Sequence, residues 1–135
     1  MTRLRPNRCS ERGAAAVEFA IVLPLLMLLV LGSMDWGYYF FVEQVVVNAA
    51  REGARAGSLQ LYANNDTAAK SDAVATCTTF ITQAGLSLAN SPNPCTAAVT
   101  ANTVTTTVTY SSGSLTGFAK TLVPPQASAT AQMRR

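Results

Sequence analysis

The sequence predicts an α+β protein: a long N-terminal transmembrane helix continues into a small domain with a second helix and a short antiparallel sheet of about three strands. Three patterns predict this class. They are an apolar run near the N-terminus, small and apolar residues at helical spacing after it, and threonine-rich segments of alternating hydrophobicity. We divide the 135 residues into a basic leader (1–13), a transmembrane helix with an aromatic interface (14–41) and an extracytoplasmic domain (42–135).

The apolar run extends from Ala14 to Met34 and is long enough to cross a bilayer. Its 21 residues include one ionisable side chain, Glu18. A helix of that length spans about 31 Å, which matches a hydrocarbon core of about 30 Å. No A-x-A-like cleavage site follows the run, so we expect it to be retained. Pro24 removes one backbone donor, which predicts either an ordinary kink or a point where the helix extends in a filament.

The positive charge of the chain is concentrated before this run. Four arginines and one glutamate within residues 1–12 account for the whole formal charge of +3. No basic patch therefore remains for binding nucleic acid. Because arginines just before an apolar helix hold that end in the cytoplasm, we expect a single-pass protein with a cytoplasmic N-terminus and a translocated C-terminal domain.

Aromatic residues follow the run in "WGYYFF", residues 36–41. Tryptophan and tyrosine favour the boundary between lipid and water, so this segment is typical of an aromatic belt at the outer interface. A cluster of phenylalanine and tyrosine can equally begin the soluble core.

The segment "VEQVVVNAAREGARAG", residues 42–57, continues the helical pattern. Ala49, Gly53 and Gly57 recur at four-residue intervals, and such small residues let another element approach the backbone closely. Each glycine costs roughly 1 kcal/mol of helix propensity relative to alanine, so we expect packing to compensate. Glu52 and Arg55 can pair along the helix, and we interpret this side as solvated rather than as a dedicated partner site.

A second helix is predicted between Asp66 and Ala84, with Asp66 as its cap and Gly85 as its stop. The following "LANSPNPCT" predicts a loop that returns Cys95 towards this helix. On the translocated, oxidising side of the membrane, Cys77 and Cys95 can form a disulfide. The alternative is two unpaired small core residues.

Alternating residues predict strands in the last third of the chain. In "TVTTTVTY", residues 103–110, the valines and Tyr110 share one face, and "ASATAQMRR", residues 127–135, repeats the alternation. Between these strands we expect Leu115, Phe118 and Leu122 to form a short helix or turn that covers one sheet edge.

The residue inventory argues against catalysis. The chain has no histidine, which removes the commonest general base and metal ligand. The few acids show no spacing for joint acid and base work, and the cysteine spacing resembles neither a zinc nor a thioredoxin motif. We therefore predict no catalytic, cofactor or metal site, and we do not expect an enzyme.

Two motifs together carry a family resemblance. The segments "RGAAAVEFAIVLP", residues 12–24, and "NAAREGARAG", residues 48–57, resemble the TadE-like minor pseudopilins of the Tad (Flp) pilus system, which are type IV pilin-like. This resemblance implies that prepilin peptidase cuts between Gly13 and Ala14, and that Glu18, Phe19 and Pro24 take part in assembly. The implied partners are other minor pseudopilins, the major Flp pilin and an assembly platform in the bacterial inner membrane, with an extracellular location after pilus assembly.

The sequence departs from relatives in two respects, and it leaves alternatives open. The acid that is frequent after the last arginine is absent, and the domain is too short for the larger TadG-like branch. A TadF-like role remains an alternative. The runner-up from another class is an uncleaved, signal-anchored module that binds an extracellular ligand.

Cleavage would give Glu18 a physical role. The new α-amine on Ala14 would be largely protonated near neutral pH, and a positive charge at a helix N-terminus opposes the helix dipole. Glu18 can balance its own chain's amine, or that of a neighbouring subunit, in which case the pair also fixes helix register. Otherwise Glu18 is a carboxylate near the cytoplasmic interface that reaches water or is protonated.

Overall fold

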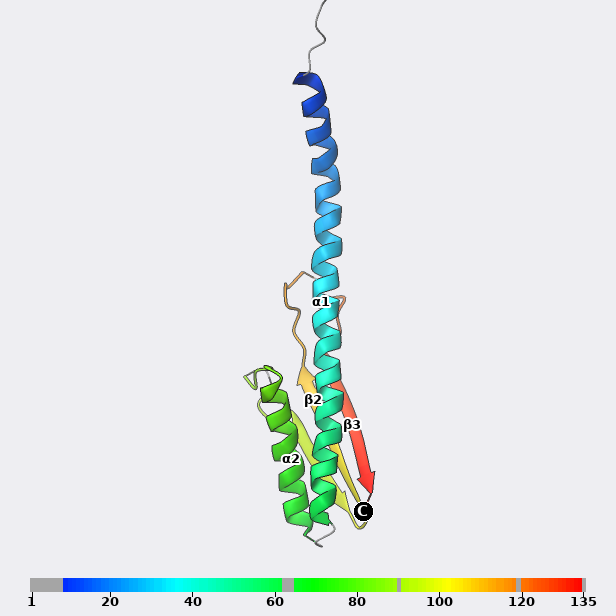
Figure 1. Ribbon diagram of the computed structural model, residues 1–135, viewed down its shortest axis with the longest axis vertical. Helices are drawn as coiled ribbons and strands as arrows, with labels where there is room; N and C mark the ends of the chain where they lie inside the picture. Colours follow the sequence, from blue (N-terminus) through cyan, green and yellow to red (C-terminus); the bar gives the residue numbers. More distant parts are fainter. Residues whose placement is uncertain (1–8, 62–64, 90, 119, 135) are drawn as a thin grey trace, which may run out of the picture.

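The computed structural model describes residues 9–61, 65–89, 91–118 and 120–134. Most of the predicted leader, residues 1–8, lies outside the described residues. Two helices and a three-stranded antiparallel sheet confirm the α+β class (Figure 1). The elements in chain order are α1 (Cys9–Leu61), α2 (Asp66–Gln83), β1 (Cys95–Thr100), β2 (Thr103–Ser111) and β3 (Gln126–Arg134).

Helix α1 is 53 residues long, and its two halves have different surroundings. Its N-terminal half projects beyond the rest of the molecule, and its C-terminal half packs beside α2 and the sheet (Figure 1). The helix continues through Pro24 without interruption.

Helix α2 begins one residue earlier than its predicted cap required. The Asn65 side chain accepts a hydrogen bond from the Ala68 backbone N–H at 3.0 Å, so Asn65 is the cap and Asp66 is the first helical residue. The prediction of Asp66 as the cap was wrong by one position. After Gln83 the chain turns at Gly85, whose φ of +83° suits a residue without a Cβ.

The sheet has the order β1-β2-β3, with β2 in the centre. Cys95 lies opposite Val108, and Tyr110 lies opposite Ala127. The sequence reading placed Cys95 in a loop and did not locate β1. Both interrupting prolines, Pro92 and Pro94, precede the strand, and the Thr109 backbone N–H donates to the Pro94 carbonyl at 2.8 Å where pairing begins.

The main core lies between α1, α2 and the inner face of the sheet. Tyr110 is the largest fully buried side chain, and its hydroxyl donates to the Ser87 carbonyl at 2.8 Å. Burial first, and then the nearby Tyr38, raise the pKa of Tyr110 above its ordinary 10.0. The described core residues of α1 form one stripe at helical spacing: Val42, Val45, Val46, Ala49, Ala50 and Ala54.

The segment between β2 and β3 differs from the expected edge cover. Leu115, Phe118 and Leu122 are exposed at 62%, 56% and 72%, and the described part of this segment has turns and bends but no helix. It rises along α1 beyond the end of the sheet (Figure 1). The expected cover of the sheet edge is not formed, because hydrogen bonds from Ser114 and Thr116 to Asp35 of α1 hold the segment there.

Candidate assembly interface

The N-terminal half of α1 presents an apolar surface that its own domain does not cover. None of the 18 most apolar consecutive residues of this helix is buried, and the helix is long and apolar enough to cross a membrane. An uncovered surface of this size favours lipid or other apolar helices as its surroundings.

The predicted processing and assembly residues all lie on this uncovered half. Gly13 and Ala14 are exposed in the early turns of α1, and Phe19 is 61% exposed. Pro24 is exposed as well. Among the residues that the structure describes, Glu18 has no hydrogen-bond or ion-pair partner, so its carboxylate is available to a group outside this part of the chain.

Asp35 marks the boundary between the uncovered half of α1 and its packed half. It is fully buried at 0% exposure. Its Oδ1 accepts a hydrogen bond from the Thr116 backbone N–H, and its Oδ2 accepts from the hydroxyls of Ser114 and Thr116, each at 2.8 Å. These donors compensate the burial of a carboxylate. Sequence reasoning missed this contact, although an acid directly after an apolar run was a visible signal.

The aromatic residues after Asp35 divide between the two predicted roles. Trp36, Phe40 and Phe41 are 39%, 54% and 46% exposed, whereas Tyr38 packs against the core. The Trp36 and Phe40 rings lie 5.7 Å apart between centroids. The segment therefore combines an exposed aromatic surface with the start of the domain core.

Gly53 and Gly57 lie where α1 packs tightly against α2 and β2. A Cβ at Gly53 would be 2.7 Å from the Ala73 carbonyl oxygen, and one at Gly57 would be 2.8 Å from the Ala69 carbonyl oxygen. Ala49 is fully buried on the same face of α1. In this structure the three small residues pack within the chain, so their contacts build the domain.

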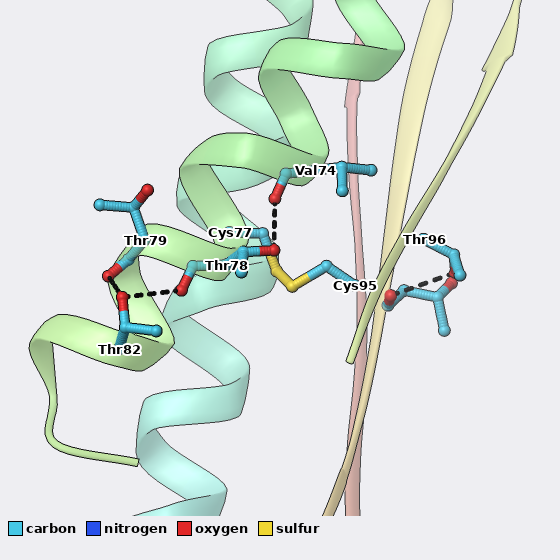
Figure 2. Close-up of a disulfide and its surroundings, with 8 residues drawn as sticks. Val74, Cys77, Thr78, Thr79, Thr82, Cys95 and Thr96 are labelled. Atoms are coloured by element: carbon cyan, nitrogen blue, oxygen red, sulfur yellow. Dashed lines mark hydrogen bonds between the residues drawn. A yellow bond between two sulfur atoms is a disulfide. The ribbon is translucent and has the colours of Figure 1, made fainter. Parts of the chain in front are cut away.

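The disulfide predicted between Cys77 and Cys95 is present and joins α2 to β1 (Figure 2). The Cα atoms of the two residues lie 6.2 Å apart, and both side chains are buried. One turn of α2 beside it carries a hydrogen bond of 2.8 Å from the Thr78 hydroxyl to the Val74 carbonyl.

A shallow groove and an exposed ion pair lie on the outer surface between α1 and α2. The groove encloses about 420 Å³, and Glu52, Thr79 and Phe80 are among its lining residues. Glu52 also pairs with Arg55 at 3.0 Å, with both side chains well exposed. Such an exposed pair contributes little to stability, and the described residues contain no group of three or more His, Cys, Asp or Glu that could hold a metal ion.

The fold and the uncovered helix together are consistent with one class: a membrane-anchored protein with a long apolar N-terminal helix and a small α+β domain. Residues 13–55 match the family model of TadE-like proteins. This match confirms the resemblance seen in the sequence and supports a TadE-like protein connected with the Tad pilus. The matched segment lies within α1, and α2 and the sheet lie outside it. No curated protein and no solved structure matches the chain.

Proposed function

We propose that this protein is a minor pseudopilin of a Tad (Flp)-type pilus. Prepilin peptidase removes residues 1–13, and the N-terminal half of α1 then packs against other pilus subunits. In this proposal the N-terminus starts in the cytoplasm, the domain is translocated across the bacterial inner membrane, and the subunit supports pilus assembly or tip formation. Its partners are other minor pseudopilins, the major Flp pilin and the assembly platform. TadE-like pilus proteins are structural rather than enzymatic.

The observation that carries this proposal is the division of α1 into two halves. The C-terminal half of α1 is buried against α2 and the sheet. The most apolar part of the N-terminal half is not covered by any other described part of the chain. Because both halves belong to one continuous helix, whatever binds the N-terminal half also fixes the orientation of the domain. This is the mechanical property that a helically packed subunit needs.

In this proposal, Glu18 determines the register in which neighbouring helices pack. It lies one helical turn after Ala14, and its carboxylate has no partner among the described residues. An amine formed at Ala14 therefore becomes its natural counter-charge, on the same chain or on an adjacent one. Between chains, pairing in a low-dielectric environment would penalise every register that leaves either charge alone.

Cleavage requires α1 to unwind locally, because the bond between Gly13 and Ala14 lies inside the helix that begins at Cys9. Proteases generally need an extended backbone at the bond that they cut. Gly13 lowers the cost of this unwinding by roughly 1 kcal/mol relative to alanine. Apart from its chain neighbours and the nearby backbone of α1, no described atom lies within 4 Å of a Cβ built there, so no tertiary contact opposes it.

Mass spectrometry of the purified protein tests processing. The chain is produced with an active prepilin peptidase and, as a control, with a catalytically inactive one. We expect a mature chain that begins at Ala14 in the first case alone. An intact leader in the presence of active peptidase would contradict the proposal and favour the uncleaved, signal-anchored binding module.

Glu18→Gln tests assembly separately from processing, because it keeps the size of the side chain and removes its charge. We expect this variant to insert in the membrane and be cleaved, but to enter pilus complexes poorly. Val17→Ala is the matched control, since it alters an adjacent exposed position without changing charge. Pilus output that Glu18→Gln leaves unchanged would rule out the charge-pairing argument.

A further inference from the structure

The strongest unexplained feature is the apolar surface of the segment that follows β2. We define the Asp35 loop as the described residues 112–118 and 120–123. It carries Leu115, Phe118 and Leu122, which are 62%, 56% and 72% exposed, although the domain core is close by. Exposing three large apolar side chains of one short loop to water is unfavourable in free energy. Something other than this domain therefore covers them.

Asp35 fixes the position of this loop along the axis of α1, which we call its height. Its carboxylate accepts from Ser114 and Thr116, which flank Leu115, at 2.8 Å each. A buried carboxylate without donors is costly, so the loop cannot leave α1 without exposing or abandoning this charge. At the other end of the loop, Val123 is buried.

The height that Asp35 fixes is the edge of the apolar run. Asp35 directly follows Met34, the last residue of the 21-residue run that begins at Ala14. Figure 1 shows the loop beside α1 at this level, beyond the end of the sheet. The exposed aromatic residues Trp36, Phe40 and Phe41 belong to the next two turns of the same helix.

We propose that the Asp35 loop is a second membrane-contact element, which inserts Leu115, Phe118 and Leu122 into the outer interface of the bilayer that α1 spans. This inference rests on the proposed membrane span and not on the pilus role. Large apolar and aromatic side chains are stable at this depth, where their polar backbone still reaches water and headgroups. Lys120, which is exposed on the same loop, suits the phosphate of an anionic headgroup.

A membrane explains the position of the loop as well as its composition. The aromatic segment 35–41 covers about 10 Å of helix axis at 1.5 Å per residue, comparable to the interfacial layer on one side of a bilayer, roughly 5–8 Å. With two contacts at the interface, α1 and the loop, the domain would be held in one orientation relative to the membrane. A single helix would leave it able to rotate and tilt.

Depth-dependent quenching of tryptophan fluorescence tests the proposal on the full chain. The protein is reconstituted in vesicles of phosphatidylcholine and phosphatidylglycerol that carry bromine near either the carbonyl end or the methyl end of the acyl chains. Trp36→Phe removes the native tryptophan, and Phe118→Trp places the probe on the loop. We expect its emission to shift to shorter wavelength and to be quenched most by bromine near the carbonyl end.

Two further probes in the Trp36→Phe background make the result decisive. Leu59→Trp is the matched control, because Leu59 is 62% exposed but lies about 38 Å along α1 from Met34, so we expect no quenching there. Val30→Trp reports on the span, because it lies about 6 Å along α1 from Met34, within the hydrocarbon of the outer leaflet, and it should be quenched. If position 118 behaves like position 59 while position 30 is quenched, the loop proposal is overturned and the span stands. If position 30 is not quenched, both fail.

Asp35→Ala, combined with Phe118→Trp, tests whether the carboxylate positions the loop. We expect quenching at position 118 to fall and quenching at position 30 to persist. Because Asp35→Ala risks unfolding the domain, the double variant Ser114→Ala/Thr116→Val removes two of the donors and leaves the carboxylate in place. Quenching at position 118 that both variants leave unchanged would show that Asp35 does not set the depth of the loop.

Discussion

Gly53→Ala is the sharpest test of how α1 packs into the domain. The added Cβ would lie 2.7 Å from the Ala73 carbonyl oxygen and 3.1 Å from both the Cys77 Cβ and the Thr106 Cγ2. The nearest of these atoms belongs to the backbone of α2, so no side chain can rotate away to relieve the contact. Cys77 is also tied to β1 by the disulfide, which limits how far α2 can retreat.

Two opposing terms set the expected magnitude. Alanine gains about 1 kcal/mol of helix propensity over glycine, while overpacking a tight core costs about 1–3 kcal/mol. Because the closest contact is with backbone that is held on both sides, we expect the cost to lie in the upper part of that range. The free energy of unfolding should therefore fall by about 1–2 kcal/mol, which lowers the Tm of a domain this size by roughly 4–8 °C per kcal/mol.

Gly37→Ala is the matched control, because Gly37 lies in the same helix and a Cβ built there meets no described atom within 4 Å apart from its chain neighbours and the nearby backbone of α1. We expect it to be neutral or slightly stabilising. Thermal unfolding of both variants in detergent is followed by near-ultraviolet circular dichroism, which reports on aromatic side chains of the domain such as the buried Tyr110 rather than on the apolar N-terminal half of α1. A Gly53→Ala variant as stable as Gly37→Ala would refute the close-packing argument.

Three further predictions concern the core. Cys77→Ala/Cys95→Ala opens a loop of sequence separation 18 and should lower the free energy of unfolding by about 3 kcal/mol; an unchanged denaturation midpoint would contradict this. Thr106 is fully buried, and its hydroxyl has no hydrogen-bond partner within the described residues. Thr106→Val should therefore raise stability by about 1 kcal/mol, and a measured loss would show that a group such as a buried water satisfies it. The raised pKa of Tyr110 means that the folded state holds the phenol proton more tightly than the unfolded state, so this contribution is complete below pH 10.0 and is lost as pH rises through the raised value. Chemical denaturation across this range should show the decline, and Tyr110→Phe should reduce it; equal declines in both proteins would argue against Tyr110 as the cause.

Helical periodicity and strand alternation were sufficient to predict most of the architecture. The run from Ala14 predicts a helix by its length and continuous apolar character, the stripe from Val42 has the spacing of one helix face, and the two merge in α1. The alternation of Val104 and Val108 with threonines gave β2, because adjacent residues of a strand face opposite sides. These signals are local, so one sequence displays them directly.

Features that depend on distant residues were not predictable in the same way. Strand β1 has a weak pattern of its own, "CTAAVT", and it is recognised through its pairing of Cys95 with Val108. The contact of Asp35 with Thr116 joins positions 81 residues apart. No local preference encodes such a pair, so Leu115 and its neighbours were assigned to a sheet edge instead of to α1.

The sequence by itself determined the α+β class, the apolar helix and the TadE-like resemblance, and it indicated which two cysteines can pair. Each of these can be recognised from the spacing of nearby residues, from residue type or from the expected cellular compartment. The tertiary structure decided that Gly53 and Gly57 pack inside the chain, that Asp35 is buried, and that the loop after β2 rises to the edge of the apolar run. These outcomes follow from steric fit and from the need to supply a buried carboxylate with donors, and both depend on which distant groups the fold brings together.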